Sequence, residues 1–238
     1  MVYIGFHDVK DWSNSYNQFD NWVNLNCVMA MSANLETYMS TITALALESD
    51  VGVLYGASQR IDGMEILKYG REQPFDFKNH IINCTKGDWS SRISHFEKIF
   101  GSCPLILKEN LKDLEILRKL RNNVGHAFGR DIDASRQHDI IEISKMESLK
   151  TEKTIEHLKL IYKVAKEIDK QLFTNNIGAY QDIYFFHKLK STLKHGDKNK
   201  AREIGNHAAI LKKSLNNHAA KAAGKVYCKG LVEYYDSI

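Results

Sequence analysis

The chain has 238 residues, of which 43% are hydrophobic and 26% charged, and it contains two prolines and 14 glycines. This composition can bury a core and excludes a disordered polymer, and so few turn-forming residues argue against an all-β sandwich. The net charge of +4 is too small to indicate a nucleic-acid partner by itself.

The periodicity of apolar residues predicts helices along almost the whole chain. The first predicted helix covers residues 13–48 and is long and amphipathic. A short helix is expected at residues 62–69. Asp88 has the side chain of an N-cap, and the helix that follows it is predicted to run to about Phe100. Further helices are predicted at residues 108–128, 151–173, 179–194, 199–216 and 221–236.

These elements predict an all-α fold with two parts. The first is a helical bundle of residues 1–174 with an irregular insertion near residues 51–86. The second is a basic helical C-terminal extension of residues 175–238 packed on it. Residues 1–50 contain one basic and six acidic residues, a net charge of −5, whereas residues 185–230 contain eleven basic and two acidic residues, a net charge of +9. This asymmetry hints at an acidic partner for the C-terminal part, and the alternative is a solvated lysine-rich helix face.

The cysteines and the hydropathy pattern indicate a compartment. Cys27, Cys84, Cys103 and Cys228 form no CxxC pair, so we expect reduced thiols in a cytoplasmic protein, not a zinc ribbon or a disulfide framework. Residues 1–10 lack the apolar run of a secretory signal. No stretch reaches the ~18 uninterrupted apolar residues of a membrane span, so no membrane partner is expected.

Motifs that are absent narrow the chemistry further. The sequence has no GxxxxGK[ST], GxGxxG, HExxH or GxSxG pattern. Its ten histidines are scattered and do not cluster with carboxylates at metal-ligand spacing. We therefore expect neither a metal nor a cofactor.

The most informative stretch lies at the end of the predicted helix 108–128. Asn122 and His126 are four residues apart on the face opposite the apolar stripe, and Arg121 lies at the border between the two faces. Two explanations of this polar face remain open. Either the face is exposed to solvent, or it lies in a groove or a symmetric interface. The apolar stripe consists of Leu107, Leu111, Leu114, Leu117, Leu120, Val124 and Phe128.

The pattern Arg121-Asn122-x-Val124-x-His126 resembles the RxxxxH motif of HEPN domains. In many members of that family a polar residue follows the arginine and an aliphatic residue lies two positions before the histidine. The resemblance covers roughly residues 13–173 and implies a helical bundle of HEPN type with additional C-terminal helices. HEPN ribonucleases dimerise with the two motifs facing a shared cleft and cut RNA without a metal, whereas other members are non-catalytic modules.

The residue types suit this chemistry. Cleavage of RNA without a metal uses the ribose 2′-hydroxyl as nucleophile and needs a proton acceptor, a proton donor and a cation. His126 would transfer protons, since histidine exchanges them near neutral pH. Arg121 would grip phosphate oxygens and Asn122 would orient the phosphate or the hydroxyl. One site has a single histidine, so we expect a homodimer to supply the second.

Other basic residues are candidates for RNA binding. Arg118 and Arg130 flank the motif, and Lys212 and Lys213 lie in the basic extension. The alternative for each is a solvated side chain. Glu115 is predicted to be an i, i+3 ion-pair partner of Arg118 rather than a catalytic acid.

Position 128 differs from the matching position of some HEPN toxins. Those toxins carry a tyrosine two residues after the histidine, and adenylylation of that tyrosine neutralises the toxin. This chain has Phe128, which excludes that route at this position and is expected to belong to the core.

The leading hypothesis is therefore a metal-independent HEPN endoribonuclease acting as a toxin or in anti-phage defence. RNA, a second copy of the chain, and an antitoxin or other regulatory protein are its candidate partners. A non-catalytic HEPN module that binds RNA, nucleotide or a protein is the first alternative. An unrelated helical scaffold with a chance RxxxxH is the second. The RNA target stays open among tRNA, mRNA and ribosomal RNA.

Overall fold

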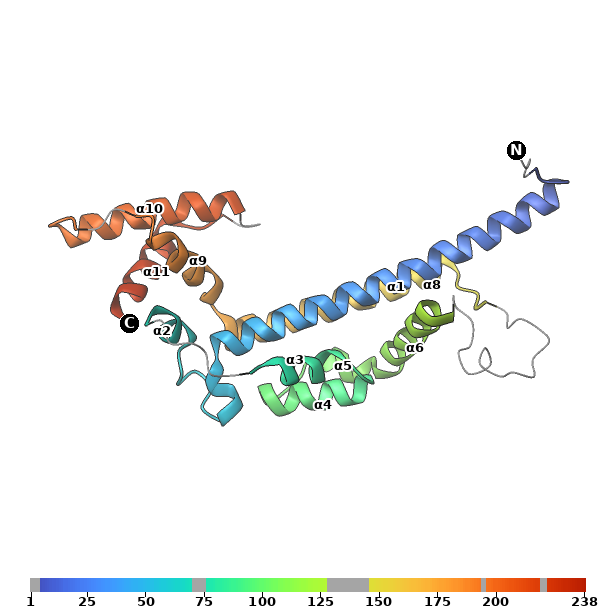
Figure 1. Ribbon diagram of the computed structural model, residues 1–238, viewed down its shortest axis with the longest axis horizontal. Coiled ribbons are helices and arrows are strands. Elements are labelled where there is room, and N and C mark those ends of the chain that lie inside the picture. The colour runs from blue at the N-terminus through green and yellow to red at the C-terminus, as the bar shows by residue number, and fades with distance from the viewer. Residues whose placement is uncertain (1–4, 70–75, 128–145, 194–195, 219–221) are drawn as a thin grey trace. The chain divides into compact units, whose positions relative to one another are not determined.

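The predicted all-α class is confirmed by the computed structural model (Figure 1). Over the residues that it describes, the secondary structure is helical, with a 3-10 turn at Val51–Tyr55, a π-helical turn at Phe173–Ile177 and no strand. An isolated bridge between Asp50 and Asp62 is the single β-type pairing in these ranges. The described residues are 5–69, 76–127, 146–193, 196–218 and 222–238.

The chain forms two compact units, each built from two separate stretches. Unit 1 comprises Met1–Thr43 and Lys78–Gln171, and unit 2 comprises Ala44–Phe77 and Leu172–Ile238. The boundary at Leu172 lies close to the predicted one at residue 174. The division differs from the prediction in the middle of the chain, because the stretch before Lys78 groups with the C-terminal helices and not with the bundle.

Helices α1 and α8 form the long axis of unit 1 and run parallel, side by side (Figure 1). Asn24 Nδ2 on α1 donates to Thr151 Oγ1 at the start of α8, 3.1 Å away, and Tyr38 OH donates to Asp169 Oδ1, 2.7 Å away and further along both helices. The helices of this unit are α1 (Val9–Ser49, which belongs to unit 2 from Ala44 onward), α3 (Lys78–Thr85), α4 (Trp89–Phe100), α5 (Leu105–Glu109), α6 (Leu111–Ala127) and α8 (Thr151–Leu172).

The core of unit 1 lies where these helices meet. From Leu25 onward, α1 buries residues at alternating three- and four-residue steps, which keeps one face turned toward the other helices. Among the fully buried side chains are Leu25, Val28, Met39, Phe96, Leu107, Leu114, Leu117, Val164 and Ile168. No helix in the described ranges is both long enough and apolar enough to cross a membrane.

The N-terminal part of α1 exposes aromatic side chains. Trp12, Tyr16, Phe19 and Trp22 each keep about half of their surface exposed, between 47% and 59%. Phe19 and Trp22 belong to the apolar pattern that predicts an amphipathic helix, yet the buried stripe starts only at Asn24 and Leu25. The reason is that α8, which covers this side of α1, begins at the level of Asn24.

Two predictions about individual helices can be compared directly with the structure. The N-cap at Asp88 is confirmed, since its Oδ1 accepts from the backbone N–H of Ser91 at 2.8 Å. The helix predicted at about residues 108–128 is confirmed as α6, except that α6 starts at Leu111. The short helix α5 before it was not predicted, and the two are separated at Asn110, whose Nδ2 donates to the Ile106 carbonyl at 2.9 Å. Helix α3 was not predicted, and Phe128 lies outside the described residues.

The buried carboxylate of Asp50 joins the two stretches of unit 2. This carboxylate accepts hydrogen bonds from Gln59 N at 2.8 Å and from Asn176 Nδ2 at 2.9 Å, and also from the Ser58 hydroxyl. The bond to Asn176 is one of several that join residues 44–77 to the C-terminal half, and Lys68 Nζ, for example, donates to the Tyr235 carbonyl at 2.6 Å. The helices are α2 (Gly63–Lys68), α9 (Tyr180–Lys190), α10 (Lys200–His218) and α11 (Lys225–Ser237).

Two glycines of unit 2 provide a matched test of its packing. A Cβ at Gly63 would lie 2.0 Å from the Glu48 carbonyl oxygen, which is backbone and cannot swing away, whereas a Cβ at Gly205 would meet nothing within 4 Å. We expect Gly63→Ala to lower the free energy of unfolding by about 1–3 kcal/mol. Gly205→Ala, inside α10, should raise it by about 0.5–1 kcal/mol. Denaturant unfolding measures both, and equal effects would contradict the close approach at Gly63.

Candidate functional site

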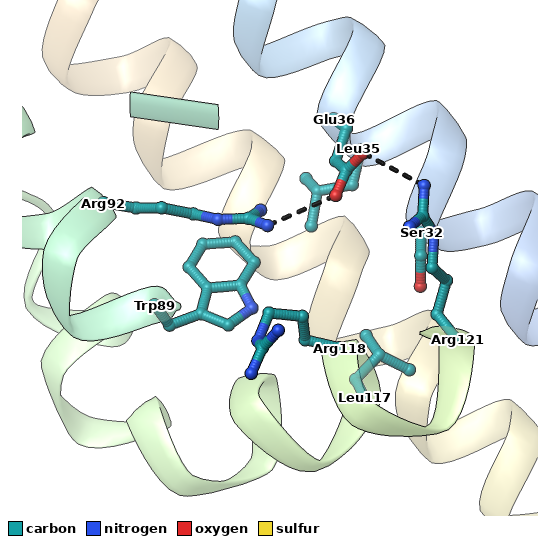
Figure 2. Close-up of a pocket in the computed structure, with 8 residues that line it drawn as sticks. All are labelled: Ser32, Leu35, Glu36, Trp89, Arg92, Leu117, Arg118 and Arg121. Atoms are coloured by element: carbon teal, nitrogen blue, oxygen red, sulfur yellow. Dashed lines mark hydrogen bonds and ion pairs between the residues drawn. The ribbon is translucent and has the colours of Figure 1, made fainter. Parts of the chain in front are cut away.

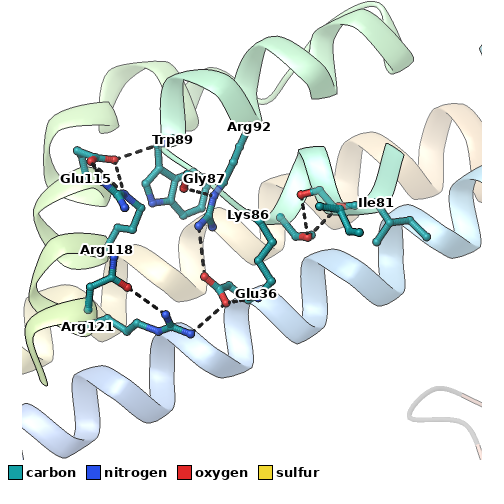
Figure 3. Close-up of polar contacts among 12 residues, drawn as sticks. Glu36, Ile81, Lys86, Gly87, Trp89, Arg92, Glu115, Arg118 and Arg121 are labelled. Atoms are coloured by element: carbon teal, nitrogen blue, oxygen red, sulfur yellow. Dashed lines mark hydrogen bonds and ion pairs between the residues drawn. The ribbon is translucent and has the colours of Figure 1, made fainter. Parts of the chain in front are cut away.

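One carboxylate, that of Glu36 on α1, joins three cations from three other parts of unit 1 (Figure 3). Arg92 on α4 contacts Oε1 at 3.2 Å. Lys86, in the turn between α3 and α4, and Arg121 on α6 both contact Oε2, at 2.8 and 3.4 Å. The predicted catalytic arginine therefore belongs to an ion-pair cluster, which we call the Glu36 cluster and define as Glu36, Lys86, Arg92 and Arg121.

Arg92 is the buried member of the Glu36 cluster. Its side chain is only 4% exposed, its Nε donates to the Gly87 carbonyl at 3.1 Å, and its guanidinium lies 4.7 Å from the centre of the Trp89 ring. Gly87 has a φ of 85°, a left-handed conformation that glycine adopts readily. A buried charge is strongly unfavourable without a partner, so Arg92 depends on Glu36.

The charges around Glu36 keep it ionised. Burial opposes ionisation, but the hydrogen bond from Lys86 and the charges of Arg121 and Arg92 outweigh it and hold the pKa of Glu36 below its usual range. Burial lowers the pKa of Arg92, and Glu36 acts against that shift. Glu36 is thus an anion that holds one buried cation and two cations nearer the surface.

Arg121 is held from two sides. Its NH2 contacts Glu36, and its NH1 donates to Asn122 Oδ1 at 3.0 Å. The side chain keeps 32% of its surface exposed. Two of the three predicted catalytic residues are therefore in direct contact, and the guanidinium reaches the protein surface.

His126 lies in the last turn of α6 and is exposed. Within the described part of the chain, no hydrogen bond or ion pair joins its ring to Arg121 or Asn122. The prediction that Leu117, Leu120 and Val124 form the buried face of this helix is confirmed. His126 and Asn122 are thus turned away from the stripe that packs α6 into the unit.

Arg118 forms its own ion pair one turn before Arg121. Its Nε donates to both carboxylate oxygens of Glu115 at 3.0 Å, and its NH2 also contacts Oε1, so the predicted i, i+3 pair is confirmed. The hydrogen bond from Arg118 holds the pKa of Glu115 below its usual range. Glu115 also accepts from the Trp89 backbone N–H at 3.3 Å. A contact between Arg118 and RNA stays a prediction.

A small hollow lies beside the Glu36 cluster (Figure 2). Its volume is about 10 Å³, which is room for about one water molecule and far too little for a nucleotide. The buried Ser32 hydroxyl, which lines it, has no hydrogen-bond partner among the described residues. A polynucleotide could therefore reach only the outer edge of the cluster. The lining residues are Ser32, Leu35, Glu36, Trp89, Arg92, Leu117, Arg118 and Arg121.

The remaining predicted residues are not among the described residues of unit 1. Lys212 and Lys213 are on α10 in unit 2, where Lys212 is half-buried and Lys213 exposed. Arg130 lies outside the described residues. In the ranges that the structure describes, no group of three or more histidine, cysteine or carboxylate side chains is placed to hold a metal ion.

Sequence reasoning missed Glu36, Lys86 and Arg92. The signal for Glu36 is faint, namely a single acidic residue between the buried positions Leu35 and Met39 of a long helix. Nothing in the local sequence pairs it with residues 50 to 85 positions away.

Comparison with protein-family models, with curated proteins and with solved structures found no match to this chain.

The lowered pKa of Glu36 makes stability depend on pH. Because the folded value lies below the ordinary value of 4.5, the ion pairs of Glu36 stabilise the fold above that pH and are lost as the pH falls through the folded value. We expect Glu36→Gln to lower the free energy of unfolding at pH 7 by about 1.5–3 kcal/mol. The difference from the parent should shrink as the pH falls below 4.5.

Denaturant unfolding at pH 7, 5 and 3.5 measures this effect. Glu167→Gln is the matched control, since Glu167 is exposed on α8 of the same unit. A loss for Glu36→Gln that is the same at every pH would contradict an ionised Glu36 as the source of the stability.

Proposed function

We propose that this chain is a metal-independent endoribonuclease of HEPN type that acts as a toxin or in anti-phage defence. The observation that carries the proposal is the position of Arg121, whose guanidinium is oriented by Glu36 and Asn122 and reaches the surface. The exposed His126 follows on the same helix. The all-α fold and the resemblance of the motif to HEPN domains support the same conclusion.

The proposed reaction needs no group beyond these side chains and the RNA. The ribose 2′-oxygen attacks the adjacent phosphorus while a base, His126, accepts its proton. The bond between phosphorus and the 5′-oxygen breaks, and an acid, the second copy of His126, protonates the leaving oxygen. Arg121 neutralises the charge that builds up on the phosphate oxygens. The products are a 2′,3′-cyclic phosphate and a 5′-hydroxyl.

A homodimer is part of the proposal, since one chain supplies one motif histidine. The exposed aromatic side chains on the N-terminal part of α1, such as Trp12 and Phe19, support association with a protein partner, because exposed apolar groups of this kind commonly mark interfaces. An antitoxin or other regulatory protein is a further partner that such a surface would suit.

The geometry also favours a second candidate, a non-catalytic HEPN module that binds RNA, nucleotide or a protein. Arg121 already has an anion, Glu36, in contact with it. A guanidinium held in this way could serve in binding alone. Cleavage assays separate the two candidates.

The first test of the proposal is cleavage of single-stranded RNA in the presence of EDTA. We expect His126→Ala to reduce the rate by ~10²–10⁴, because general acid–base catalysis is lost. Arg121→Ala should also reduce it strongly. His7→Ala is the control, since His7 is exposed and lies outside the motif. A substrate with 2′-deoxyribose at the cut site should resist all four proteins.

Cleavage by both motif variants at the parent rate would end the nuclease proposal. Binding of RNA by the parent without any cleavage would favour the non-catalytic module. Cyclic phosphate ends in the product would identify the 2′-hydroxyl as the nucleophile.

The second test concerns the dimer. If the site needs two copies of His126, the cleavage rate per chain should fall on dilution as the dimer dissociates. Light scattering over the same concentration range measures the mass. An active protein that keeps the mass of one chain, with a constant rate per chain, would contradict the two-histidine site.

A further inference from the structure

The Glu36 cluster carries more positive than negative charge at its outer edge. Glu36 contributes one negative charge, and Lys86, Arg92 and Arg121 contribute three positive charges. Arg92 is only 4% exposed, and it shares the single carboxylate with the other two cations. The two cations nearer the surface, Lys86 and Arg121, are left only partly neutralised.

These two cations lie close together and face solvent. Both contact the same oxygen, Oε2 of Glu36, at 2.8 and 3.4 Å, so Lys86 Nζ and Arg121 NH2 lie within about 6 Å of each other. Lys86 is 60% exposed and Arg121 is 32% exposed. Figure 3 shows both side chains reaching Glu36, one from the turn after α3 and one from α6.

A phosphodiester fits between such a pair. It presents two non-bridging oxygens that share one negative charge, and each can accept a charge-assisted hydrogen bond at about 2.7–2.9 Å. Lysine and arginine together would contribute one compact donor and one planar donor. The neighbouring hollow has room for only about one water molecule, so the phosphate would lie on the surface and not inside.

We propose that Lys86 is a second phosphate-binding residue, which together with Arg121 grips one phosphodiester of single-stranded RNA. Lys86 lies 35 positions before the motif arginine and outside the motif Arg121–His126 itself. The inference rests on the proposed function, because it names RNA as the ligand of the same site. It assigns no proton transfer to Lys86.

The test uses binding and not cleavage. The probe is a single-stranded RNA with 2′-O-methyl groups throughout, which cannot be cut through the 2′-oxygen. Its affinity is measured by fluorescence anisotropy between about 50 and 200 mM salt. Lys86→Gln should weaken binding about twofold to fivefold, as expected for one exposed ion pair. It should also reduce the slope of log K against log salt by ~0.7.

Two matched variants accompany it. Lys98→Gln makes the same charge change at an exposed lysine of α4 outside the cluster and should leave the slope unchanged. Lys86→Arg keeps the charge and should keep the slope of the parent. Lys86 is largely exposed, so the variants should fold, and thermal unfolding checks this.

The outcomes separate this inference from the proposed function. If Lys86→Gln binds with the slope of the parent, or if the parent does not bind the probe, the inference is overturned, whether or not cleavage depends on His126. If the slope falls only in Lys86→Gln and no protein cleaves RNA, the phosphate contact stands and the nuclease function is overturned. A loss shared equally by Lys98→Gln would also overturn the inference.

Discussion

The buried Arg92 sets the main constraint on unit 1. A guanidinium that is 4% exposed needs an anion, a carbonyl and a flat surface, and the chain supplies them as Glu36, the Gly87 carbonyl and the Trp89 ring. Meeting this requirement brings α1 and α4 together at one point. Arg121 on α6 reaches the same carboxylate, so the orientation of the motif arginine follows from how a buried charge is compensated.

Much of the fold could be predicted because helices are local. Apolar spacing predicted α1 and α8, and the side chain of Asp88 predicted the start of α4. The break at Asn110 was missed because the spacing of Leu107, Leu111 and Leu114 continues smoothly across it. The grouping of residues 44–77 with the C-terminal helices involves distant contacts, such as the bond between Asp50 and Asn176, 126 positions apart, which no local pattern contains.

The candidate site, like the fold, could be predicted from the sequence only in part. The faces of α6 follow from the helical repeat, so the buried Val124 and the exposed His126 could be predicted from spacing alone. The partners of Arg121 could not all be predicted. Asn122 is its neighbour in sequence, but Glu36 lies on another helix, and which helices meet is decided by packing.

The position of Trp89 gives the protein a built-in optical reporter. Of the three tryptophans, Trp12 and Trp22 are about half exposed, whereas Trp89 is 3% exposed and stacks on Arg92. A water-soluble quencher such as iodide would therefore suppress the emission of the first two and spare that of the indole next to the guanidinium. The residual fluorescence would report events at the junction of α1 and α4 without any attached dye.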